Sequence, residues 1–122
     1  MAQYACIKAL AVYLPEQIEK NDMGDERFIA KLGIEERHIA GDTESSGDLA
    51  VAAAESLFGQ YAIPRESIEF ILLCTQHPDY LGPTTACHVQ SRLGIPETSG
   101  ALDYSLGCSG YVYASVIFFM FM

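Results

Sequence analysis

The sequence predicts an α/β fold with a mainly parallel sheet flanked by helices. Short apolar runs of strand length alternate with segments of helical periodicity, and glycine or proline marks most of the boundaries between them. The central runs also lack polar alternation, which is typical of parallel strands covered on both faces. Right-handed crossovers would place the helices on those faces. A chain of 122 residues suits one folding unit with one core.

Apolar runs predict the strands. Residues 4–13 are apolar on both faces of a two-residue period and are halted by Pro15, as in an interior strand. Residues 70–74 form a continuous apolar run, and residues 101–106 form another that leads into a tight turn. Residues 35–40, in which charged side chains alternate, predict a brief strand with one solvent face.

The helices are predicted from apolar residues spaced three to four apart and from end signals. Residues 25–33 open with an acidic cap and end on Gly33. Residues 49–61 have helical periodicity and follow a capping box at residues 45–48. A third helix is predicted with Pro83 in its first turn and Gly94 beyond its end. The apolar residues 111–122 predict a last, buried helix, because a membrane span needs about twenty residues.

Composition narrows the classes of partner. The formal charge of −9, from 16 acidic and 7 basic residues, argues against nucleic acid or an anionic membrane as a partner. The four cysteines form no C-x-x-C pair, so neither a disulfide framework nor a zinc site is indicated, and we expect reduced thiols in the cytoplasm. No other metal site is indicated.

Cys108 has the position of a nucleophile. It lies in Gly107-Cys108-Ser109-Gly110, between small residues where a predicted strand turns into a helix. Unpaired amides at a helix start favour the thiolate anion and can stabilise the oxyanion formed when it attacks an acyl thioester. The alternative is a small buried hydrophobic residue, which is the common role of free cysteine. We expect that role for the other three cysteines, with Cys6 and Cys74 in apolar strands.

Four blocks in the same order carry a family resemblance. They are YLPEQ at residues 13–17, GIEERHIA at 33–40, PTTACHVQSRLGI at 83–95 and DYSLGCSGY at 103–111. Through them the chain resembles 3-oxoacyl-acyl-carrier-protein synthase III, a ketosynthase of the thiolase superfamily. The resemblance implies a thiolase-like fold of two α/β halves. Residues 1–122 would be a truncated N-terminal domain with the second half absent. The apolar ending at residues 115–122 also differs from the family.

The resemblance also implies a reaction. The family loads an acyl group from acyl-CoA onto the cysteine that matches Cys108, and condenses it with malonyl-acyl-carrier protein in fatty-acid biosynthesis, as a homodimer and without a cofactor. A histidine and an asparagine from the second half assist the condensation. His38, His77 and His88 do not match that histidine, so we expect this chain alone to be inactive in condensation.

Three matched positions differ from the family. Arg27 and Lys31 stand where a tryptophan and an arginine help to hold CoA, and Gly82 stands where a bulky residue limits the acyl pocket. Lys31 would meet a phosphate as a point charge, without a guanidinium fork. Two alternatives therefore stay open. One is acyl transfer to an oxygen or nitrogen nucleophile in specialised metabolism, and the other is an inactive fragment or interaction module.

Overall fold

The computed structural model describes residues 6–21 and 26–121, which fall into two units. One unit comprises the described part of residues 1–13 together with 46–121, and the other comprises residues 14–45 around the gap. The smaller unit pairs β1 (Gln17–Lys20) with β2 (Glu36–Ile39) as an antiparallel ribbon and includes α1 (Glu26–Leu32). The helix and strand predicted at 25–33 and 35–40 are confirmed within the described residues.

Side-chain hydrogen bonds tie the ribbon to its connections. The Arg37 guanidinium pairs with Glu19 across the strands at 3.0 Å and also donates to Asn21. The Asn21 side-chain amide donates to the Ile34 carbonyl at 2.8 Å, so the two ends of the helical connection meet. Every residue of β1 is exposed, and its polar sequence gave no strand signal.

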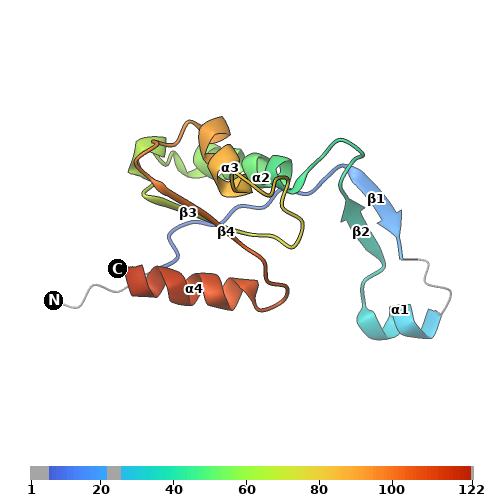
Figure 1. Cartoon of the computed structure of the whole chain (residues 1–122). Coiled ribbons are helices and arrows are strands. Elements are labelled where there is room, and N and C mark those ends of the chain that lie inside the picture. Colours follow the sequence, from blue (N-terminus) through green and yellow to red (C-terminus); the bar gives the residue numbers. More distant parts are fainter. Residues whose placement is uncertain (1–5, 22–25, 122) are drawn as a thin grey trace. The chain divides into compact units, whose positions relative to one another are not determined.

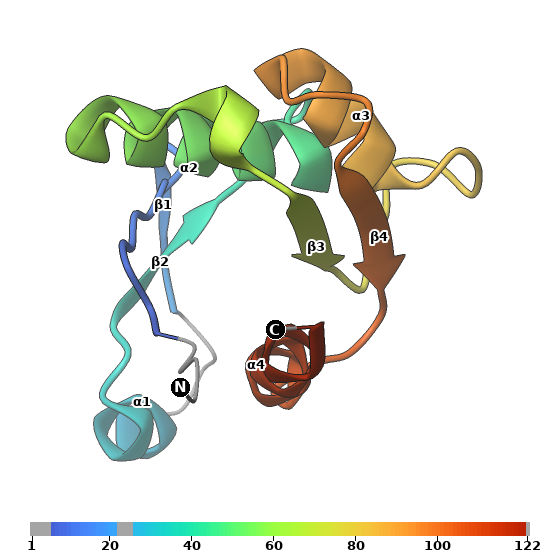
Figure 2. The ribbon, with the colours of Figure 1, turned by 90° about the vertical axis from the view of Figure 1, so that its left-hand side faces the viewer.

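The larger unit has a parallel pair of strands at its centre. β3 (Phe70–Cys74) and β4 (Gly100–Tyr104) pair from Phe70 with Gly100 to Cys74 with Tyr104. α2 (Ser46–Tyr61) and α3 (Thr85–Leu93) cover one face of this pair, and α4 (Gly110–Phe121) lies on the other (Figure 1). The view turned by 90° shows α2 and α3 on one side of the strand pair and α4 on the other (Figure 2). The α/β prediction is confirmed.

The core of the larger unit lies between the sheet and the α2–α3 layer. Phe58 of α2 packs with Val89 and Leu93 of α3 and with Ile95, all less than 10% exposed. Partly buried residues surround this cluster: Ala50, Val51, Ala54, Ile63, Ile68, Ile71 and Leu73. The predicted apolar face of α3 is therefore its buried face.

Carboxylates from neighbouring loops and strands hold the starts of the helices. Asp103 at the end of β4 accepts hydrogen bonds from the Thr85 and Ala86 amides, each at 2.6 Å, at the start of α3. Asp79 likewise accepts from the Gly47 amide of α2 at 3.1 Å. Such acceptors satisfy amides that a helix cannot pair internally, and their charge matches the helix dipole. At the other end of α3, Gly94 takes the left-handed φ of 64° that favours glycine.

Two predictions about buried segments are wrong. Residues 6–13 form no strand, and Ile7, Leu10 and Val12 are each more than 60% exposed; Tyr4 and Ala5 lie outside the described residues. Apolarity alone does not make a strand, because a strand requires a backbone partner. α4 forms as predicted, but Phe119 is 62% exposed and Met120 is 80% exposed, since the sheet covers one side of the helix. Within the described residues, no helix has the length and apolarity needed to cross a bilayer.

Candidate functional site

The turn between β4 and α4 presents Cys108 to solvent. β4 ends at Tyr104 and α4 begins at Gly110, so a short connection carries the thiol. The Gly110 amide closes the turn by donating to the Gly107 carbonyl at 2.9 Å. Cys108 is exposed, so the alternative of a small buried hydrophobic residue is wrong for this position. Cys108 lies two positions before Gly110, the first residue of α4, where the first amides of a helix have no partner within the helix.

Two side chains from the strand ends support this turn from the sheet side. The Tyr104 hydroxyl donates to the Gly110 carbonyl at 2.6 Å, and the Cys74 thiol donates to the Leu106 carbonyl at 3.3 Å. Burial, together with the neighbouring Cys74 side chain, raises the pKa of Tyr104 above its usual value of 10.0, while a hydrogen bond from the Ala114 amide opposes the shift. The phenol is therefore a neutral donor at physiological pH.

Gly110 is needed because of its close approach to the sheet. It is buried, and a Cβ at this position would overlap the sulfur of Cys74. The first turn of α4 thus rests directly on the end of β3. Glycine allows the backbone to come this near to the sheet. The contact fixes the position of the first residue of α4, two positions after Cys108.

The other cysteines lie in different surroundings. Cys6 is exposed and lies in no strand, so the prediction for it is wrong. Cys74 lies in β3 as predicted, but it is exposed at the end of the strand and not buried. Cys87 is half-buried on α3 and its sulfur accepts a hydrogen bond from the Thr84 hydroxyl at 3.2 Å. Among the described residues no cluster of metal-binding side chains is found.

The remaining predicted site residues are all on the surface. Arg27 and Lys31 are exposed on α1 of the smaller unit, four positions apart and so on the same side of the helix. Gly82 is exposed in the loop before α3 of the larger unit, and a Cβ there would meet no atom within 4 Å. Cys108 and Gly82 therefore share one unit, whereas the two basic residues belong to the other.

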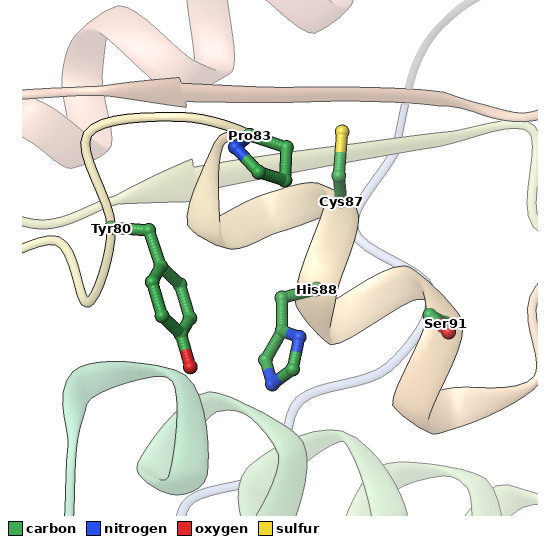
Figure 3. Close-up of a pocket in the computed structure, with 5 residues that line it drawn as sticks. All are labelled: Tyr80, Pro83, Cys87, His88 and Ser91. Carbon is green, nitrogen blue, oxygen red and sulfur yellow. The ribbon is translucent and has the colours of Figure 1, made fainter.

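Sequence reasoning missed a shallow pocket on α3 and the loop before it. It has a volume of about 310 Å³ and is lined by Tyr80, Pro83, Cys87, His88 and Ser91 (Figure 3). The Tyr80 and His88 rings meet edge to face, with centroids 5.3 Å apart. The sulfur of Cys87 points away from the His88 ring (Figure 3). The two side chains therefore do not form a thiol–imidazole pair, and only the four-residue spacing of 83, 87 and 91 signalled a shared face.

Curated relatives are similar to the chain over most of its length. Beta-ketoacyl-(acyl-carrier-protein) synthase III of Thiobacillus denitrificans (strain ATCC 25259 / T1) is 39% identical over 118 residues, covering 91% of this chain and 37% of the relative. The protein of the same name from Aliivibrio fischeri (strain ATCC 700601 / ES114) is 40% identical, with the same coverage. The chain thus spans little more than a third of the length of these relatives. No family model matches it.

Solved structures of such synthases are also similar to this chain. A 3-oxoacyl-(acyl-carrier-protein) synthase III crystal structure is 49% identical and superposes with a TM-score of 0.82, covering 88% of this chain and 34% of that one. The beta-ketoacyl-(acyl-carrier-protein) synthase III from Thermus thermophilus is 34% identical, with a TM-score of 0.83 over 93% of this chain and 37% of that one. The thiolase-like fold predicted from the sequence is therefore confirmed.

Proposed function

We propose, from the homology of this chain to the beta-ketoacyl-(acyl-carrier-protein) synthase III proteins, that Cys108 accepts an acyl group from acyl-CoA. The observation that carries the proposal is the exposed thiol at a tight turn into a helix start. Residues 1–122 act as the N-terminal thiolase-like domain of this acyltransferase. Cys108 is the catalytic nucleophile.

The loading step follows from the geometry of the turn. The Cys108 thiolate attacks the thioester carbonyl, and a new carbon–sulfur bond forms while the carbonyl electrons move to oxygen. Backbone amides at the start of α4 stabilise this oxyanion. When the oxyanion collapses, the bond to the CoA sulfur breaks, and CoA leaves as a thiolate that takes up the proton released by Cys108. The step needs no metal ion or cofactor beyond the substrate.

The second step in the proposed reaction uses malonyl-acyl-carrier protein. Decarboxylation of the malonyl group gives a carbanion that attacks the acyl-Cys108 thioester and releases a 3-oxoacyl product for fatty-acid synthesis. None of His38, His77 and His88 matches the histidine that polarises the malonyl thioester in the family that this chain resembles. We therefore assign loading to these 122 residues and condensation to the full-length cytoplasmic protein, acting as a homodimer.

Substrate binding is assigned to surface residues. Lys31 contacts a CoA phosphate as a point charge, and Arg27 lies one helical turn before it on α1. Gly82 leaves room for a larger acyl group, because nothing lies near the position of its absent side chain. That open space also supports the second candidate function, acyl transfer from Cys108 to an oxygen or nitrogen nucleophile.

Acylation measured by intact mass tests the proposal. The purified chain is incubated with acyl-CoAs of increasing chain length, beside Cys108→Ala and, as a matched control on an unrelated helix, Cys87→Ala. We expect one added acyl group in the parent chain and in the Cys87 variant, and none in the Cys108 variant. A folded chain that takes up no acyl group from any donor would support the alternative of an inactive fragment.

A further inference from the structure

Two side chains that are paired in register across the sheet hold both sides of the turn that carries Cys108. Cys74 and Tyr104 are register partners at the ends of the parallel strands β3 and β4. Register partners in a sheet project to the same face. The Cys74 thiol holds the Leu106 carbonyl before Cys108, and the Tyr104 hydroxyl holds the Gly110 carbonyl after it.

These carbonyls fix the direction of two amides. A peptide unit is planar and trans, so its N–H points opposite to its C=O. Holding the Leu106 carbonyl toward Cys74 directs the Gly107 N–H away from Cys74. Holding the Gly110 carbonyl along α4 turns the Tyr111 N–H toward the helix start. These two peptide units flank residues 107–110, so holding them fixes the backbone that carries the Cys108 thiol.

We infer that Tyr104 and Cys74 are positioning residues for Cys108, acting through the two peptide units that flank it. This inference rests on the proposed role of Cys108 as nucleophile. Tyr104 is suited to the task because it is half-buried and its raised pKa keeps it a hydrogen-bond donor. The close approach of Gly110 to the Cys74 sulfur couples the two contacts into one support.

Thiol reactivity measures the support without any acyl donor. The chain is treated with limiting iodoacetamide at neutral pH, and alkylation of Cys108 is expressed relative to Cys6, which is also exposed and lies elsewhere. The variants are Tyr104→Phe and Cys74→Ala, which remove a donor, and Cys74→Ser, which keeps one. Tyr113→Phe is the matched control, because Tyr113 lies on α4 and is 56% exposed.

We expect the Cys108-to-Cys6 ratio to fall about threefold to tenfold in Tyr104→Phe and in Cys74→Ala, the size expected for one lost hydrogen bond. Cys74→Ser and Tyr113→Phe should stay within about twofold of the parent ratio. General loosening of the fold would also disturb the turn that carries Cys108, so circular dichroism is used to check that each variant keeps the parent fold. Because Cys74→Ser keeps a hydrogen-bond donor, comparing it with Cys74→Ala separates the loss of the hydrogen bond from the loss of packing.

An unchanged ratio in both donor-deleting variants, with circular dichroism showing an intact fold, would overturn the inference. If Tyr104→Phe does not fold, the comparison between Cys74→Ala and Cys74→Ser decides it: equal ratios in the two contradict the inference, and a loss confined to alanine supports it. Failure of the proposed function is a different result, namely a parent chain that accepts no acyl group although its alkylation ratio depends on both donors.

Discussion

The carboxylate of Asp103 should contribute strongly to stability, because it joins the end of β4 to the start of α3. It accepts two backbone hydrogen bonds of 2.6 Å, from Thr85 and Ala86, which are both fully buried. Removing the carboxylate leaves two buried amides without their acceptor, and each such loss costs about 1.5 kcal/mol. We therefore expect Asp103→Ala to lower the free energy of unfolding by about 3 kcal/mol, a large part of the roughly 5–15 kcal/mol typical of a domain.

Urea unfolding followed by circular dichroism measures this change. Asp103→Asn should lose about half as much, since an amide oxygen still accepts one of the bonds. The matched control is Glu97→Ala, which removes an exposed carboxylate near the same strand and should change stability by less than about 0.5 kcal/mol. If Asp103→Ala is no more destabilising than Glu97→Ala, the carboxylate does not hold the start of α3 and the argument is refuted.

Two further predictions concern a close contact and an ion pair. Gly110→Ala should destabilise the chain by about 1–3 kcal/mol and slow acylation of Cys108, because its Cβ would overlap a sulfur of the sheet. Thermal unfolding measures the change in stability. The control is Gly59→Ala, whose Cβ would meet no atom within 4 Å and which should raise stability by about 0.5–1 kcal/mol. A hydrogen bond from Arg65 lowers the pKa of Glu55 below 4.5. The stabilisation from this pair is therefore present above that value and is lost as the pH falls through the lowered pKa. We expect a small difference in urea midpoint between the parent and Glu55→Gln at neutral pH, and no difference in acid.

Much of the fold could be predicted because local signals and tertiary structure agree. α2, α3 and β3 each combine the right apolar period with a boundary residue, and the structure forms them there. β1 was missed because Gln17–Lys20 is polar, and its strand exists through pairing with β2. Residues 6–13 were wrongly predicted for the converse reason: they are apolar but have no strand partner among the described residues.

One part of the candidate site could likewise be predicted from the sequence, and another part could not. Cys108 could be found from the sequence, since glycine and serine neighbours between a strand and a helix make a local signal. The support from Tyr104 and Cys74 could not, because the two residues are 30 positions apart and only the strand register brings them together. The pocket at Tyr80 and His88 also depends on the path of the loop before α3, which no residue pattern specifies.

The central claim is that Cys108, among four cysteines, is built to accept an acyl group. Peptide mapping by mass spectrometry after incubation of the chain with an acyl-CoA tests this most directly. The account predicts that the acyl group is recovered on the peptide containing Cys108, with Cys6, Cys74 and Cys87 unmodified under the same conditions. Recovery of the acyl group mainly on Cys6 or Cys74, the other exposed cysteines among the described residues, would show that exposure alone governs the reaction, and would contradict the role given to the turn.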